Sequence, residues 1–159
     1  ATQNPAEQMG TNPLPESQLD RFLIQVSLGY PDEQSEKRML ARAFVARRGS
    51  PVTALNINIE EERAKAQRVN IADNVLDYLY RLVVETRNTT HFQRGLSPRA
   101  ALGLVALSKA WAYLHRRDYV LPDDVQHVFP YVATHRVAAN TTRSSLAITM
   151  VLNTVPIHA

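Results

Sequence analysis

Two arginines stand where a positive charge could act on a bound anion, and Arg99 is the clearer of the two. Ser97 and Pro98 predict the start of a helix, because serine favours the N-cap and proline the first helical position. Arg99 then falls in the first turn, where the helix dipole disfavours a cation by roughly 0.3 to 1 kcal/mol. A phosphate at that end would reverse the sign, because free N–H groups and a guanidinium together bind anions. The alternative is a solvated arginine.

Arg21 is the second candidate. It lies between Asp20 and an apolar segment, near the end of the proline-containing stretch ATQNPAEQMGTNPLPESQLDRF that opens the chain. Its guanidinium could act on an anion or could simply pair with Asp20 or another nearby group, and the sequence leaves both interpretations open.

Other chemistries find little support. No glycine starts a G-x-x-x-x-G-K-[ST] loop, the five histidines lack metal-ligand spacing, and the chain has no cysteine. No metal site is expected. The segment Leu55 to Glu61, LNINIEE, resembles an apolar strand ending in magnesium-binding carboxylates, but Asn56 and Asn58 interrupt it. We therefore predict a loop that enters a helix with an acidic first turn.

The composition is that of a soluble globular protein of 159 residues with 45% hydrophobic and 21% charged residues. Eighteen basic and fifteen acidic residues give a net charge of +3, and the basic residues are scattered. Nucleic acid is thus permitted as a partner but not indicated. No apolar run approaches the length of a membrane span, and no signal peptide opens the chain, so we expect a cytoplasmic protein.

Residues Phe22 to Leu28 alternate in polarity with a period of two, which predicts a strand. A lone strand has unpaired backbone on both edges and needs partners. We expect it to be frayed, paired with Ala1 to Gln3, or completed by another molecule.

The rest of the chain has helical patterns. We expect helices from about Asp32 to Arg48, Glu60 to Gln67, Ala72 to Arg87, Ser97 to Arg116, from Pro122 onward, and Ser144 to Leu152. The helix from Ala72 to Arg87 has an apolar stripe of Val75, Leu76, Leu79, Leu82 and Val83. The apolar face of the longest helix comprises Leu104, Leu107, Trp111 and Leu114. Pro130 is expected to kink or split its helix, because proline removes a hydrogen bond and clashes with the preceding turn.

Several motifs in this order resemble the MoxR family of AAA+ ATPases. They are ATQNP, EQ-x-GT-x-PLPE-x-QLDRF, GYP, VETR, LSPRA, RRDYVLPDDV and HRV, and they cover most of the chain. The resemblance implies a mainly α fold: a helical-bundle AAA+ lid over residues 30–159, with a short β remnant of the α/β ATPase core in residues 1–29. The sequence departs from the family after Val137 and at His115 to Arg117, where a glycine-containing turn is usual.

The same resemblance implies roles for three residues. Asn4 matches the sensor-1 residue that orients the attacking water, and Arg21 matches the arginine finger that enters the neighbouring subunit's nucleotide site. Arg99 matches the sensor-2 arginine that contacts phosphate from the lid. An arginine finger has a physical rationale, because phosphoryl transfer needs positive charge where negative charge develops.

The family implies a protein that binds and hydrolyses ATP with Mg²⁺ as a ring, expected to be a hexamer, and that remodels or matures partner proteins. Von Willebrand factor A domain proteins are expected among those partners. We expect the phosphate loop and Walker B strand upstream of Ala1, so this chain alone should bind no nucleotide and hydrolyse none. The alternatives are a magnesium-chelatase-like AAA+ subunit and a non-catalytic helical interaction or DNA-binding module.

Overall fold

A computed structural model of the chain describes residues 1–2, 14–42, 56–140 and 144–157. Its elements run along the chain in the order α1 (Glu16–Leu19), α2 (Glu33–Arg42), α3 (Ile59–Gln67), α4 (Asp73–Glu85), β1 (Phe92–Arg94), α5 (Pro98–Leu114), α6 (Pro122–Ala133), β2 (Ala138–Ala139) and α7 (Ser144–Thr154). The prediction of a mainly helical fold is confirmed. No helix among these residues is both long and apolar enough to cross a bilayer.

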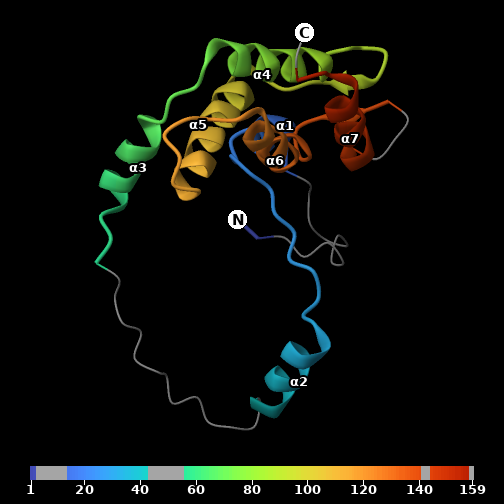
Figure 1. Cartoon of the computed structure of the whole chain (residues 1–159). Helices are drawn as coiled ribbons and strands as arrows, with labels where there is room; N and C mark the ends of the chain where they lie inside the picture. The colour runs from blue at the N-terminus through green and yellow to red at the C-terminus, as the bar shows by residue number, and fades with distance from the viewer. Residues whose placement is uncertain (3–13, 43–55, 141–143, 158–159) are drawn as a thin grey trace.

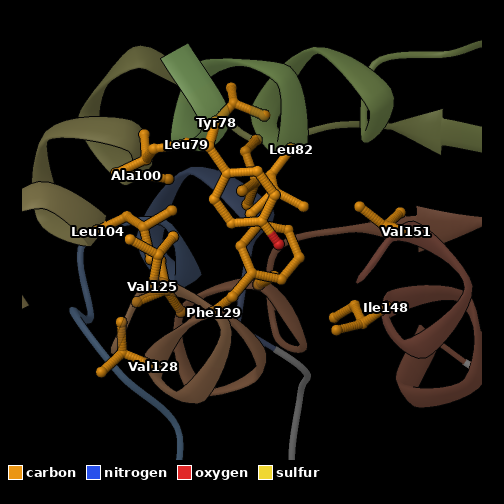
Figure 2. Close-up of a cluster of buried hydrophobic side chains, with 14 of the residues drawn as sticks. Tyr78, Leu79, Leu82, Ala100, Leu104, Val125, Val128, Phe129, Ile148 and Val151 are labelled. Carbon is orange, nitrogen blue, oxygen red and sulfur yellow. The ribbon is translucent and has the colours of Figure 1, made fainter. Parts of the chain in front are cut away.

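Helices α4 to α7 form one bundle with a shared core, and α3 packs against α5 (Figure 1). Helix α2 lies apart and contacts no other described element, although Met39 and Leu40 are exposed on it. The core includes the fully buried side chains of Tyr78, Leu82, Leu104, Phe129 and Ile148 (Figure 2). The apolar stripe of α4 was expected from its spacing and is buried there, because a helix with apolar residues three and four apart has one core face.

The buried face of α5 differs from the expected one. Its buried residues are Ala100, Leu104, Ser108 and Ala112, spaced four apart. Of the expected face, Leu104 is buried and Leu107 and Trp111 are partly buried against the core, whereas Leu114 is 73% exposed. Small side chains in an i±4 row let neighbouring helices approach closely, and α5 packs most extensively against α6. Ser108 satisfies its buried hydroxyl within the helix by donating to the Leu104 carbonyl at 2.8 Å.

The strand predicted at Phe22 to Leu28 is not formed. This segment is irregular in the structure and runs past α6, where the Gln25 N–H donates to the Tyr131 carbonyl at 2.9 Å. Its side chains Val26 and Leu28 are exposed. The alternation requires a strand partner, and no strand among the described residues pairs with it. The one described sheet is instead the antiparallel pair β1 and β2, which sequence reasoning did not anticipate.

Two local predictions have clear outcomes. Residues 56–58 are a loop that leads into α3, whose first turn is acidic, as expected. The Asn58 side chain caps this helix by accepting from the Glu61 N–H at 3.3 Å, which the sequence analysis did not predict. Pro130 does not split its helix, since α6 continues to Ala133. Pro130 lies in the last turn, where little helix remains to be disrupted.

The turn between α5 and α6 (residues 115–121) contains the departure from the family pattern. Arg116 has φ 58°, the left-handed region that favours glycine. The N–H groups of Arg116 and Arg117 donate to the carbonyls of Tyr113 and Ala112, at 2.8 and 3.0 Å. These bonds form a Schellman motif, which normally has glycine at this position. The arginine therefore holds a glycine conformation at a steric cost.

Arg117 then ties this turn to the start of α6. Its guanidinium donates to both carboxylate oxygens of Asp124, at 2.6 and 2.5 Å, and Asp124 also accepts from the Leu121 N–H at 2.7 Å. Burial raises the pKa of Asp124, but the Arg117 guanidinium and the Leu121 N–H outweigh burial and leave that pKa below its usual value. Two consecutive helices are thereby fixed by one bidentate pair.

Candidate functional site

The start of α5 has the geometry that the sequence predicted. Ser97 is the N-cap, its hydroxyl accepts from the Ala100 N–H at 3.1 Å, and Pro98 is the first helical residue. Arg99 follows in the first turn with an exposed side chain. In the part of the chain that the structure describes, its guanidinium forms no hydrogen bond or ion pair. Its charge therefore stands unneutralised at a helix N-terminus.

The position at which α5 begins is fixed by three hydrogen bonds that the side chains of Thr86 and Arg87 make with the backbone. Thr86 donates to the Val83 carbonyl at 2.6 Å and accepts from the Leu96 N–H at 3.0 Å, and Arg87 donates to the Leu96 carbonyl at 3.0 Å. A Cβ on Gly95 would collide with the Thr86 carbonyl oxygen. The VETR segment at the end of α4 therefore sets the position of the Ser97 cap.

Arg21 follows α1 in a turn, where its N–H donates to the Gln18 carbonyl at 3.1 Å. The alternative that Arg21 pairs with Asp20 is not observed. The Asp20 carboxylate instead accepts from the Ser97 hydroxyl, at 2.9 and 3.0 Å, and from Arg136 Nε at 3.1 Å. The Arg21 side chain is exposed and has no partner within the described ranges.

Arg136 connects the segment that contains Arg21 to the end of α6. It lies just beyond α6, is 5% exposed, and donates to the main-chain carbonyls of Asp20 at 3.1 Å, Leu23 at 2.9 Å and Phe22. It also donates to the Val132 carbonyl at 2.6 Å. Burial lowers the pKa of Arg136, and the Asp20 carboxylate offsets part of that effect. Sequence reasoning noted this residue only within HRV and assigned it no role.

His135 supports the same contact. Its Nε2 lies 2.9 Å from the Phe22 carbonyl, and burial lowers the pKa of its imidazole. A neutral ring must then donate from Nε2, which leaves Nδ1 as an acceptor, and this atom is buried with no partner among the described residues. We call the set formed by residues 20–23, Ser97, His135 and Arg136 the Arg136 junction.

A cavity of about 260 Å³ borders the Arg136 junction. Its remaining wall includes Glu16 and Arg94, which form an ion pair, and Arg94 also donates to the Arg136 carbonyl at 2.7 Å. Two carboxylates, of Glu16 and Asp20, and two guanidinium groups, of Arg94 and Arg136, line this cavity. It therefore has no strong preference for an anion. Among the described residues, no three histidine, aspartate or glutamate side chains gather as metal ligands.

The structure thus brings the backbone of two of the three predicted residues, Arg21 and Arg99, close to the same hydrogen bond. Asp20, next to Arg21, is hydrogen-bonded to Ser97, two residues before Arg99. Arg21 and Arg99 therefore both extend from the backbone around the Asp20 to Ser97 contact, with exposed guanidinium groups. Asn4 lies outside the described residues.

Comparisons with known proteins agree with the architecture. A family model described as the AAA lid domain matches residues 84–150, and one described as the ATPase family associated with various cellular activities (AAA) matches residues 1–24. A crystal structure of a protein from Cytophaga hutchinsonii, named a candidate ATPase, superposes with a TM-score of 0.79 at 30% identity. That likeness covers 97% of this chain and 52% of the other.

Two curated relatives extend the match. The chain is 39% identical over 142 residues to the uncharacterized protein YeaC of Bacillus subtilis, covering 86% of this chain and 43% of YeaC. It is 37% identical over 150 residues to Chaperone MoxR1 of Mycobacterium tuberculosis, covering 86% of this chain and 39% of that protein. The chain thus spans less than half the length of these relatives. It belongs to the MoxR family of AAA+ ATPases and matches the C-terminal part of its members.

Proposed function

We propose that this chain supplies phosphate-sensing and arginine-finger groups to an ATP-hydrolysing ring. The remaining parts, a phosphate loop and the carboxylates that hold Mg²⁺, would come from the portion of MoxR proteins that this chain does not match. We call a protein with both portions the complete ATPase. In it, residues 1–29 would end the ATPase core and residues 30–159 would form the lid.

The observation that carries this proposal is the exposed Arg99 at the capped start of α5, whose guanidinium has no partner among the described residues. A helix N-terminus and an exposed guanidinium in its first turn both favour a phosphate. We assign Arg99 to the sensor-2 role, contacting ATP bound to the same subunit. The charge that is unfavourable without nucleotide then becomes a contribution to binding.

Arg21 fits a different role because its segment is fastened to the lid while its side chain stays exposed. We assign it to the arginine finger that acts on ATP in the neighbouring subunit of a homo-oligomeric ring, of six subunits by family resemblance. A finger supplied in trans contributes about 10³ to 10⁵ in rate. Asn4 keeps the proposed sensor-1 role.

The work driven by hydrolysis is proposed from the relatives. Chaperone MoxR1 is named for a chaperone role. We infer that the complete ATPase remodels or matures partner proteins in the cytoplasm, and we propose von Willebrand factor A domain proteins as one class of partner. The Arg99 site itself tests only the nucleotide step.

The test compares Arg99→Ala, Arg21→Ala and the control Arg63→Ala in the complete ATPase. Arg63 is a suitable control because it is exposed on α3 and, among the described residues, forms an ion pair with Glu60 alone, at 3.5 Å. We expect Arg99→Ala to weaken ATP binding by about 10- to 150-fold, the equivalent of a lost charge-assisted hydrogen bond. Arg21→Ala should keep nucleotide affinity and lose turnover.

Fluorescent-nucleotide titration measures the affinity, and phosphate release measures the turnover. Mixed rings separate the two roles. A subunit that has a disabled phosphate loop but keeps Arg21 should restore turnover at the nucleotide site of an adjacent Arg21→Ala subunit, because it still donates its own finger. If affinity and turnover are both untouched by Arg99→Ala in an assembled ring, the sensor assignment is wrong.

A further inference from the structure

The Arg136 guanidinium forms hydrogen bonds with the backbone on both sides of Arg21. It donates to the carbonyl of Asp20, which precedes Arg21, and to the carbonyls of Phe22 and Leu23, which follow it. The acceptors come from a segment more than one hundred positions away in the chain, and the donor is 5% exposed. A buried cation with this many backbone acceptors is costly to move, because any displacement leaves the charge or the carbonyls unpaired.

We propose that Arg136 is a positioning residue for Arg21, and that it couples the arginine-finger segment to the lid. This inference rests on the proposed function, in which Arg21 acts as the finger. By holding three carbonyls around Arg21, Arg136 fixes the backbone direction from which that side chain leaves. It also engages the Asp20 carboxylate, the nearest anion that could otherwise capture Arg21.

The same contact reaches the nucleotide-sensing end of the lid. Asp20 accepts from the Ser97 hydroxyl while it accepts from Arg136, and Ser97 caps the helix that contains Arg99. A displacement of α5 caused by phosphate at Arg99 would therefore be transmitted through Ser97 and Asp20 to the Arg21 segment. Sensing in one subunit and finger insertion into the next would be mechanically linked.

Arginine is specifically suited to this position. Its planar group presents five donors in fixed directions, and here all three nitrogens are used on acceptors from two segments. Lysine would keep the charge but concentrate three donors at one point, so it cannot reach the same acceptors together. Glutamine keeps part of the stem and loses the charge.

The first test measures hydrogen exchange on this chain. In Arg136→Gln, amides of residues 20–25 should exchange at least about tenfold faster, because their carbonyl anchors are lost, while amides in the middle of α5 keep their protection. Exchange of these amides in Arg136→Lys should be intermediate between wild type and Arg136→Gln. The lysine variant provides the test if the glutamine variant does not fold. Ile148→Val in α7 is the matched control for a modest loss of core stability. Unchanged exchange at residues 20–25 in both Arg136 variants would overturn the inference.

The second test is a double-mutant cycle on turnover in the complete ATPase. Arg136→Gln should lower turnover about 10- to 100-fold with little change in nucleotide affinity, as expected for a misplaced catalytic group. On the Arg21→Ala background the same change should cost almost nothing further, because there is no finger left to misplace. Losses that multiply would show that Arg136 acts on general stability and would refute the positioning role.

These readouts separate the inference from the proposed function. If Arg21→Ala retains wild-type turnover, the finger assignment fails, and the positioning role fails with it. If Arg21→Ala is slow but the two losses multiply, the finger stands and the coupling through Arg136 is wrong. Faster exchange together with a non-additive cycle supports both.

Discussion

Two partly buried arginine–aspartate contacts stabilise this protein in different ways. Arg117 and Asp124 are seven positions apart and join consecutive helices through a bidentate pair. Arg136 and Asp20 are 116 positions apart and join α6 to the segment that contains Arg21. The first pair belongs to the scaffold of the lid, whereas the second fastens a functional segment onto it. The difference teaches that equal chemistry can stabilise a whole domain or only the position of one loop.

The largest effect should come from removing Arg117. Replacing it with methionine leaves the Asp124 carboxylate, 5% exposed, without its cation, and a buried charge without its partner costs about 3 to 5 kcal/mol. We expect a loss of about 3 kcal/mol in the free energy of unfolding, since the Leu121 N–H still binds the carboxylate. Urea unfolding followed by circular dichroism measures it. If Arg136→Met lowered the free energy of unfolding by the same amount as Arg117→Met, the distinction between the two contacts would be contradicted.

Acid provides the control for that prediction. The pKa of Asp124 is lower in the folded state than in the unfolded state, so its contribution is complete above the unfolded value of 3.8 and is lost as the pH falls through the folded value. The unfolding free energy of the wild type should therefore decline below about pH 5 more steeply than that of Arg117→Met. Parallel declines would show that Asp124 is not the group responsible.

The next largest effect concerns Ser97, which serves both as a helix cap and as a donor to Asp20. Aspartate is ordinarily as good an N-cap as serine, and alanine costs about 0.5 to 2 kcal/mol. Here Ser97→Asp places a second carboxylate against Asp20 and should destabilise the Arg136 junction more than Ser97→Thr, which keeps the hydroxyl. Hydrogen exchange of residues 20–25 tests this. Equal protection in the aspartate and threonine variants would show that Ser97 acts as a cap alone.

The smallest effect is a gain at the α5–α6 turn. Arg116 holds φ 58° at a position that glycine occupies without a Cβ penalty. Arg116→Gly should raise the unfolding free energy by up to about 1 kcal/mol, less the extra entropy that glycine gives the unfolded chain. Thermal unfolding measures the shift, and Arg68→Gly in the helix-capping position after α3 is the comparison expected to lose stability. A destabilised Arg116→Gly would mean that the arginine side chain contributes more than its backbone strain costs.

Local features of this chain were readable from its residues because their causes are local. The Ser97 cap, the Pro98 start of α5, the Asn58 entry to α3 and the apolar stripe of α4 depend on neighbours within a few positions. The motifs around Arg21 and Arg99 also indicated the family correctly. These predictions needed no knowledge of which helices would meet.

Features that depend on distant partners were missed or wrong. Alternation at Phe22 to Leu28 is a strand signal only if another strand pairs with it, and in the described structure the backbone of Gln25 bonds to α6 instead. The buried face of α5 follows its small residues because α6 packs closely there, which spacing of large apolar residues could not reveal.

The sequence by itself determined the longer helices, the Ser97 cap and the place of Arg99 in the first turn of α5, because hydrogen bonds and side-chain periodicity within a few residues decide them. Only the tertiary structure decided that Arg136 would be buried against the Arg21 segment. A charged group is stable in such a site only when several acceptors converge on it, and here they come from Asp20, Phe22, Leu23 and Val132. Convergence of that kind exists only after the chain has folded.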